Sequence, residues 1–237
     1  MLKEFGSPDE VFRAPLRRLE ACNIQAPSAQ AIVKKDSFKR AEKDLTNLCR
    51  VAARVINWTE PEYPQTLLQI YDPPVMLYVR GNSQILNAPS LSIVGTRKPT
   101  LYGSQMTERL GRDLALRGIV IVSGLARGID AIAHQGALAV GAWAIGVLGT
   151  GIDVCYPKEN KKLYEKVLEN GAIPSEFPMG THSSPENFPI RNRIVAGMPL
   201  GEIIVEGAQY SGSLITARLA MEFGREVFGV PGNVTHR

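Results

Sequence analysis

From Leu91 onward the chain repeats one unit: a short apolar run, a glycine-rich turn and a helical segment. Strands are predicted at 91–94, 119–122, 144–148, 173–175, 202–205 and 226–230, and helices at 103–117, 128–140, 159–170, 191–196 and 214–223. Strands that alternate with helices through short turns predict a parallel sheet. Because the strands are almost continuously apolar, we expect helices to cover both faces. The predicted fold class is α/β, with a doubly wound, mainly parallel sheet.

The segment before this repeat is predicted to be a small N-terminal helical domain, residues 1–56. Ser7 is followed by Pro8 and, three positions on, by Glu10, which is the pattern of a helix N-terminus. Helical spacing then continues to about residue 56 through Leu45, Leu48, Ala52 and Val55. Basic pairs in this region are interpreted as a solvated face.

A second domain is predicted over residues 57–237. Its first part, 58–74, is rich in proline and aromatic residues and is expected to be a packed connector rather than a flexible linker. A short strand is expected at 75–79.

Charge and cysteine usage limit the function classes. Lys and Arg number 27 and Asp and Glu 23, a balance of +4 that permits a nucleic-acid partner without requiring one. Three scattered cysteines and three histidines exclude a structural zinc site and a disulfide framework. The uncharged run 131–152 contains glycines and reads as helix, turn and strand rather than a membrane span. The first ten residues have no apolar signal stretch, so we expect no membrane association and a cytoplasmic location.

Glycine, hydroxyl and cationic residues follow several of the predicted strands. In an open α/β sheet the carboxyl ends of the strands meet at one edge, and ligands bind in the crevice there. Glycines let an anion approach the backbone, and arginine contacts phosphate with two donors. We predict a phosphate-handling crevice that contains Arg97, Lys98, Ser123, Gly124, Arg127, Gly128, Lys158, Ser211, Gly212 and Ser213.

A second cluster of candidate residues lies at Phe188, Arg191, Asn192 and Arg193. Basic residues beside an aromatic ring suit single-stranded nucleic acid, because phosphates pair with arginine and bases stack on rings. In a helix the two arginines would point about 200° apart. One would therefore reach the ligand while the other holds the loop through a carboxylate. Phe188 taken alone is better explained as a core residue than as a stacking platform.

No catalytic or nucleotide-binding motif is complete. The P-loop pattern is absent, and GTGIDV at 149–154 departs from the dinucleotide-binding pattern at its last position. His134 has no nucleophile near it in the sequence. Four carboxylates near strand ends could act as a general base or bind Mg²⁺, but they are more simply helix caps or partners of arginines: Asp130, Asp153, Glu176 and Glu206. We predict no catalytic residue, no metal and no cofactor.

A series of ordered motifs resembles the DNA-processing protein A (DprA/Smf) family. The motifs are GTRKPTLYG at 95–103, SGLARGID at 123–130, GTGIDVCYPKEN at 149–160, SEFPMG at 175–180, FPIRNRI at 188–194, SGSLITA at 211–217 and VPGNV at 230–234. DPPVMLYVRG at 72–81 also fits. The resemblance covers nearly the whole chain.

The resemblance implies an extended Rossmann domain behind a helical one, and a protein that is not an enzyme. It implies binding of single-stranded DNA, protection of incoming DNA and loading of RecA recombinase during natural transformation and recombination. The DNA pocket would comprise Arg97, the SGLARG turn, Lys158, Phe188 with residues 191–193, and the turn at Ser211. A homodimer would form through the C-terminal part of the Rossmann domain.

The chain departs from the family pattern at its carboxyl end. It stops at Arg237, shortly after VPGNV, where family members continue with a Gly/Asn-rich segment and often a winged-helix domain. We expect a C-terminally truncated domain, either a fragment or a natural truncation. The missing segment bears on dimerisation and RecA contact more than on DNA binding.

Two other functions remain open on the sequence. The alternative is a nucleotide-processing enzyme of the lysine-decarboxylase-like phosphoribohydrolase type. Those enzymes are similar in fold and carry a PGGxGTxxE motif, but the matching turn at 207–222 reads GAQYSGSLITARLAME. A third possibility is a sensor of small nucleotides, which would bind one mononucleotide and no oligonucleotide.

Overall fold

The computed structural model describes residues 2–207 and 211–232. The chain divides into two compact units, Met1–Asn47 and Leu48–Arg237, which are described separately. The VPGNV motif at 230–234 and the turn before Ser211 lie partly outside the described residues.

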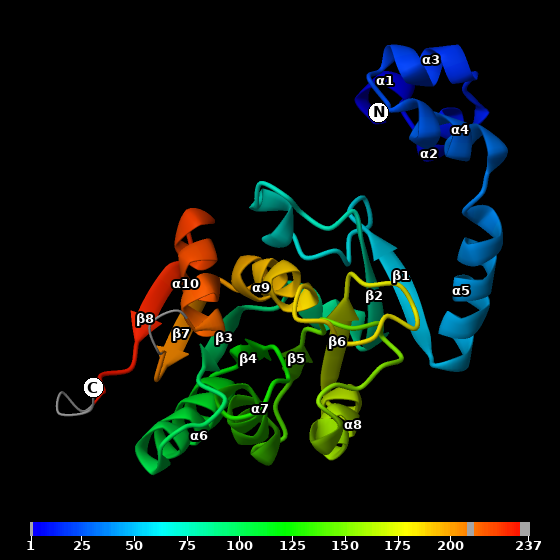
Figure 1. Ribbon diagram of the computed structural model, residues 1–237. Coiled ribbons are helices and arrows are strands. Elements are labelled where there is room, and N and C mark those ends of the chain that lie inside the picture. The colour runs from blue at the N-terminus through cyan, green and yellow to red at the C-terminus, as the bar shows by residue number, and fades with distance from the viewer. Residues whose placement is uncertain (1, 208–210, 233–237) are drawn as a thin grey trace. The chain divides into compact units, whose positions relative to one another are not determined.

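The first unit is helical (Figure 1). It contains α1 (Leu2–Phe5), α2 (Pro8–Arg13), α3 (Leu16–Ala21), α4 (Ala26–Lys34) and the start of α5 (Phe38–Arg50). The predicted N-cap of α2 is confirmed, because the Ser7 hydroxyl accepts a hydrogen bond from the Glu10 N–H at 3.3 Å. A small apolar core holds the helices together and includes Phe5, Val11, Ala14, Leu19 and Ala29.

The second unit is built on a sheet that has eight strands among the described residues. These are β1 (Ala53–Asn57), β2 (Met76–Gly81), β3 (Ser90–Gly95), β4 (Val120–Ser123), β5 (Ala144–Gly146), β6 (Gly171–Ser175), β7 (Gly201–Val205) and β8 (Glu226–Gly229). Their spatial order is β1-β2-β6-β5-β4-β3-β7-β8. The pairs from β6 to β8 are parallel, whereas β1–β2 and β2–β6 are antiparallel. The α/β class and the mainly parallel sheet are confirmed.

The strand order reverses between β3 and β7. From β3 the chain steps outward through β4, β5 and β6, and it then returns to place β7 on the other side of β3. Loops leave the carboxyl ends of β3 and β7 in opposite directions, which opens a crevice at this point of a Rossmann-like sheet.

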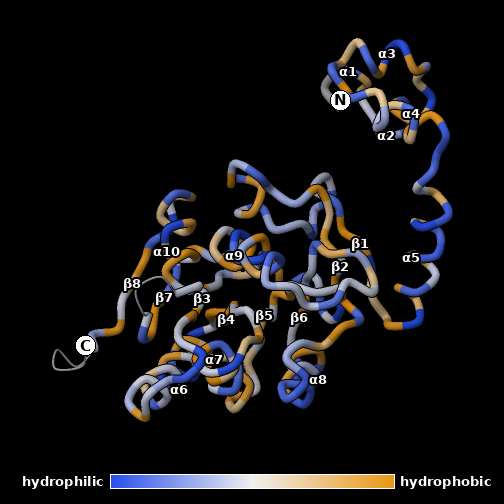
Figure 2. The backbone as a smooth tube through the Cα atoms, in the orientation of Figure 1, coloured by the Kyte–Doolittle hydropathy of each residue, from blue (hydrophilic) through white to orange (hydrophobic). Residues whose placement is uncertain are grey.

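Helices cover both faces of the sheet, as Figure 1 shows. One face carries α6 (Leu101–Ala115), α7 (Ile129–Ala139) and α8 (Lys161–Glu169), and the other carries α9 (Asn187–Gly197) and α10 (Gly212–Glu222). Along α6 the hydropathy alternates between hydrophilic and hydrophobic (Figure 2), as expected of a helix with one face on the sheet. Buried aliphatic side chains from the strands fill both layers.

The prediction that helical structure continues to about residue 56 is wrong for the last residues of that range. Helix α5 ends at Arg50, Ala52 has a left-handed φ of 50°, and β1 follows. In β1 the side chain of Ile56 is buried while Arg54 is exposed, and the strand pairs with β2. Sheet pairing therefore overrides a local spacing that also fitted a helix.

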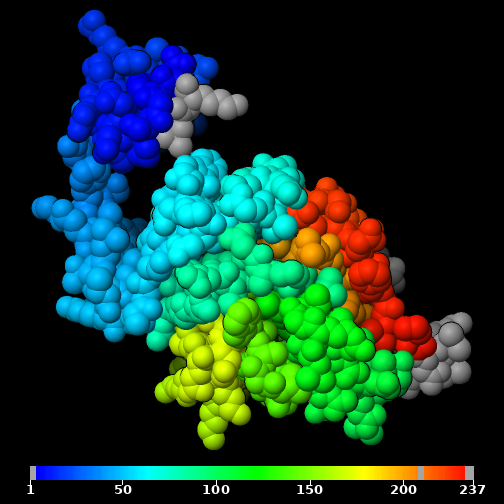
Figure 3. All heavy atoms as spheres, turned by 180° about the vertical axis from the view of Figure 1, so that it is seen from behind, coloured from blue at the N-terminus to red at the C-terminus, as the bar shows by residue number. Residues whose placement is uncertain are grey.

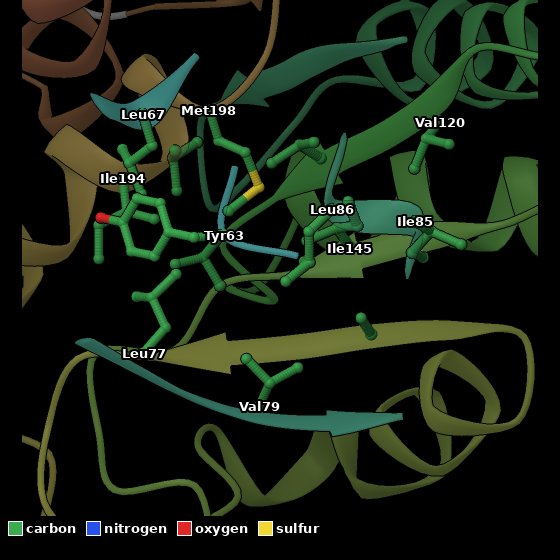
Figure 4. Close-up of a cluster of buried hydrophobic side chains, with 14 of the residues drawn as sticks. Tyr63, Leu67, Leu77, Val79, Ile85, Leu86, Val120, Ile145, Ile194 and Met198 are labelled. Atoms are coloured by element: carbon green, nitrogen blue, oxygen red, sulfur yellow. The ribbon is translucent and has the colours of Figure 1, made fainter. Parts of the chain in front are cut away.

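The proline-rich connector is packed, as predicted. Tyr63 and Leu67 are fully buried, and the Tyr63 hydroxyl donates to the Pro74 carbonyl at 2.6 Å. Figure 4 shows Tyr63 among Leu67, Ile194 and Met198. Figure 3 shows the molecule from behind the view of Figure 1, and there the connector (cyan) meets the C-terminal part of the chain (red). At this contact Arg225 donates a hydrogen bond to the Thr66 carbonyl at 2.7 Å.

Residues 131–152 form most of α7, a turn, the short strand β5 and the loop after it. The prediction of helix, turn and strand is confirmed, although β5 ends at Gly146 rather than at Leu148. No helix within the described part of the chain is long and apolar enough to cross a membrane.

Candidate nucleic-acid interface

A cleft of about 730 Å³ opens at the carboxyl ends of the strands, where their order reverses. Many of the residues that the sequence selected line it: Arg97, Lys98, Phe188, Arg191, Asn192, Ser211, Gly212 and Ser213. They come from the loop after β3, from α9 and from the start of α10. The structure thus brings together the strand-end cluster and the Phe188–Arg193 cluster.

A small recess of about 30 Å³ adjoins the cleft. It shares Arg97, Phe188 and Arg191 with the cleft and adds the predicted residues Gly124 and Arg127. Arg127 is exposed and forms an ion pair with Glu159. This pair raises the pKa of Arg127 and lowers the pKa of Glu159.

Phe188 lies in the wall of the cleft with other members of its candidate cluster, and not in the core, which was the explanation for this residue taken alone. Its ring centroid is 5.6 Å from that of Tyr156, and the Arg97 guanidinium carbon lies 5.7 Å from the Phe188 centroid. Tyr156 is 38% exposed and was missed as a site residue. Its position two residues before Lys158, in a loop that follows a strand, was the available signal. Phe188 is the second residue of α9, which starts at Asn187, earlier than predicted.

Arg191 is buried, with 6% of its surface exposed, yet it lines the cleft and the recess. Its Nη1 donates to the Val147 carbonyl at 3.4 Å, and its Nε has no hydrogen-bond partner among the described residues. Burial lowers the pKa of Arg191, and the nearby carboxylate of Asp130 opposes that change. The guanidinium is therefore held beside the cleft, and its buried Nε lacks a hydrogen-bond partner among the described residues.

Asp130 stabilises the turn that faces Arg191. Its carboxylate accepts hydrogen bonds from the N–H groups of Gly124 at 3.1 Å and Ala126 at 3.4 Å. Burial raises the pKa of Asp130, and the charge of Arg191 opposes the rise.

Arg193 points away from the cleft and does not line it. Its Nη1 and Nη2 donate to the two carboxylate oxygens of Glu176 at 2.7 and 2.6 Å, and its Nε lies 3.4 Å from Asp72. The predicted divergence of Arg191 and Arg193 is confirmed. We therefore assign Arg193 to holding α9 in place instead of to ligand contact.

Three other predicted residues also lie outside the lining of the cleft and recess. Ser123 is buried and donates to the Ile93 carbonyl at 2.7 Å, so it joins β4 to β3. Gly128 has a left-handed φ of 73°, and a Cβ there would lie 2.4 Å from the Thr96 carbonyl oxygen. Lys158 is exposed and directly follows Pro157, which lines the recess.

The remaining strand-end carboxylates also have structural partners. Asp153 accepts a hydrogen bond from the Gly180 N–H at 2.8 Å. Glu206 accepts one from the Thr100 N–H at 2.8 Å and another from the Thr100 hydroxyl at the start of α6. No group of three or more His, Cys, Asp or Glu residues in the described ranges could hold a metal ion. These contacts fit the interpretation as caps and arginine partners.

Comparison with known proteins places this geometry in context. The family model for DNA recombination-mediator protein A matches residues 54–237. DNA processing protein DprA of Bacillus subtilis is 43% identical over 174 residues, which are 73% of this chain and 59% of the relative. The chain spans between 45% and 61% of the length of three such curated relatives.

Two solved structures of the same kind are similar throughout the fold. The X-ray structure of DNA processing protein A from Streptococcus pneumoniae has a TM-score of 0.82 and 36% identity, over 90% of this chain and 73% of that one. The Helicobacter pylori protein has a TM-score of 0.71 and 34% identity, over 77% and 82%. The latter structure is described in terms of its single-stranded DNA binding mode.

Proposed function

Because the chain belongs to the DNA recombination-mediator protein A family, we propose that it is a DNA-processing protein that binds single-stranded DNA in the cleft between β3 and β7. The observation that carries the proposal is the convergence of Arg97, Lys98 and Arg191 with the Phe188 ring in that cleft. The Helicobacter pylori relative, described by its single-stranded DNA binding mode, supports it.

The chemistry of the cleft favours unpaired bases over a duplex. Phosphates pair with the guanidinium groups of Arg97 and Arg191, and the ammonium of Lys98 adds to the positive charge. A base stacks on Phe188, which requires a base whose face is free. Stacking is open to every base, so the proposed binding has little sequence preference.

We regard the protein as a binding module and not as an enzyme. Asp130, which lines the cleft, and Glu206, which directly follows β7, both accept hydrogen bonds from backbone N–H groups. Binding of DNA in this cleft requires no cofactor.

The finer role that the family resemblance implies is protection of incoming DNA and loading of RecA recombinase during natural transformation, in the cytoplasm. A homodimer through the C-terminal part of the domain fits the sheet, because β8 is an edge strand of the sheet that the described residues form, and an edge strand can pair with a second chain. Phe228 on β8 and Met221 on α10 are 50% and 59% exposed there. Sedimentation velocity would measure the dimer, and RecA strand exchange with and without the protein would measure loading.

The decisive test of DNA binding is fluorescence anisotropy of labelled oligo-dT, titrated at several salt concentrations against a duplex competitor. We expect binding that weakens with salt and is displaced by single strands more readily than by duplex. Absence of oligo-dT binding at low salt would refute the proposed function, and release of ribose from nucleoside monophosphates would favour the phosphoribohydrolase alternative.

A further inference from the structure

The recess beside the cleft is too small for a passing DNA strand. Its volume is about 30 Å³, enough for about two water-sized groups of 10–15 Å³ each. That space suits two oxygens of a phosphoryl group and cannot hold a sugar or a base. Gly124, Gly149, Thr150 and Pro157 line the recess and do not line the cleft. A terminal group of a strand that lies in the cleft is small enough to enter this space.

The recess carries a high density of positive charge. Arg97, Arg127 and Arg191 all line it. Arg127 is engaged with Glu159, and Arg97 lies over the Phe188 ring. Glu159 accepts this hydrogen bond from Arg127, whereas Asp130 accepts one from the Gly124 N–H.

Arg191 is the buried cation of these three, and its Nε has no hydrogen-bond partner among the described residues. It is buried, and the acceptor that the described residues offer to it is one carbonyl at 3.4 Å. A buried guanidinium is costly unless hydrogen-bond acceptors surround it. An anion in the recess would supply acceptors for its free donors in the two-pronged geometry that arginine forms with phosphate.

A terminal phosphate fits these demands better than a phosphate within a strand. A phosphodiester carries one negative charge, whereas a phosphomonoester carries about −1.5 to −2 and presents three acceptor oxygens. We propose that the recess is a phosphomonoester site, which takes the phosphorylated end of a DNA strand while the adjoining nucleotides lie in the cleft. This proposal rests on the proposed function, and a free nucleoside monophosphate would offer the same chemistry.

The test compares oligo-dT strands that differ at one end. Internally labelled strands of one length carry a 5′-hydroxyl, a 5′-phosphate or a 3′-phosphate, and a 5′-hydroxyl strand one nucleotide longer controls for added charge. We expect a phosphate at one of the two ends to raise the binding affinity by about tenfold, which is roughly the contribution of one charge-assisted hydrogen bond. The longer hydroxyl strand should change the affinity by less than twofold. Equal affinity of all these strands, with no effect of free nucleotide, would overturn the site while leaving DNA binding intact.

Two variants test whether the recess produces the effect. Arg191→Lys keeps the positive charge but removes the planar guanidinium and its paired N–H donors. Gly124→Ala displaces the guanidinium. In both, the affinity ratio of phosphorylated to hydroxyl strand should fall to about one. Arg109→Ala, on the exposed side of α6, should keep the wild-type ratio. A ratio unchanged in both recess variants would also overturn the site.

Free ligands distinguish the two sources of the phosphoryl group. Thymidine monophosphate and inorganic phosphate are added at matched ionic strength, with chloride as the control. A rise in Tm with thymidine monophosphate and no end effect on strands would assign the recess to a free nucleotide. An end effect that thymidine monophosphate does not reproduce would assign it to the strand end.

Discussion

The guanidinium of Arg191 lies directly against the backbone of Gly124, where a Cβ would come within 1.5 Å of Nη1. The turn after β4 and the helix α9 are therefore fitted to each other through a glycine. The obstacle to a larger residue is the far end of a side chain rather than backbone, so the arginine can move while the fold persists.

Gly124→Ala should displace Arg191 and weaken binding of oligo-dT by about tenfold, because a charge-assisted contact is worth roughly that factor. The free energy of unfolding should fall by only about 1 kcal/mol. Anisotropy and urea unfolding measure the two effects. Gly229→Ala is the matched control, since a Cβ there meets nothing within 4 Å. Wild-type DNA affinity in Gly124→Ala would remove Arg191 from the interface.

Arg97→Ala and Lys158→Ala test the cleft wall and the segment that follows Pro157. Each should lower oligo-dT affinity and make the plot of log K against log salt shallower by about 0.7, the value for one phosphate contact on a single strand. Arg97→Ala should weaken binding more, because it also removes the cation over Phe188. Arg109→Ala controls for the loss of one surface charge. An unaltered salt slope in both variants would contradict the assigned contacts.

Arg193→Ala should affect stability instead of the salt slope. Its side chain is only 11% exposed and shares two hydrogen bonds with Glu176. Losing them should lower the free energy of unfolding by about 2 kcal/mol. A double-mutant cycle with Glu176→Ala should give a coupling above about 1 kcal/mol, since the two residues form one unit. A drop in salt slope equal to that of Arg97→Ala would instead place Arg193 on the DNA.

Glu202 gives the fold a pH dependence near neutrality. It is fully buried on β7, accepts a hydrogen bond from the Ser92 hydroxyl at 3.2 Å, and burial raises its pKa from 4.5 to about 8. Between those values the folded protein holds a proton that the unfolded chain has released. Stability from this group therefore falls with rising pH, by about 1.4 kcal/mol per pH unit.

The clearest window for that effect is pH 6.5 to 8. Burial lowers the pKa of His134 from 6.5 to about 3, so His134 acts in the opposite sense below pH 6.5 and is silent above it. Urea unfolding at several pH values should show a decline above pH 6.5 that Glu202→Gln removes. Parallel curves for wild type and variant in this window would show that Glu202 keeps an ordinary pKa.

Much of the fold could be predicted because its signals are local. Apolar runs that end in glycine and alternate with helical segments predicted the strands from β3 to β8 and the edge where their loops meet. The antiparallel strand β1 could not be predicted in this way. Its residues also satisfy helical spacing, and only pairing with β2 selects the extended form.

The sequence by itself determined that Arg191 and Arg193 diverge, because helical geometry separates residues two apart. Tertiary structure decided which of them faces the cleft. Packing of α9 on the sheet directs Arg191 toward Gly124, and Glu176, which follows β6, captures Arg193 across 17 positions of the chain. The tertiary structure also placed Phe188 against Tyr156 in the cleft wall. Residue type and spacing fix what a side chain can bind, but contacts between distant segments fix where it points.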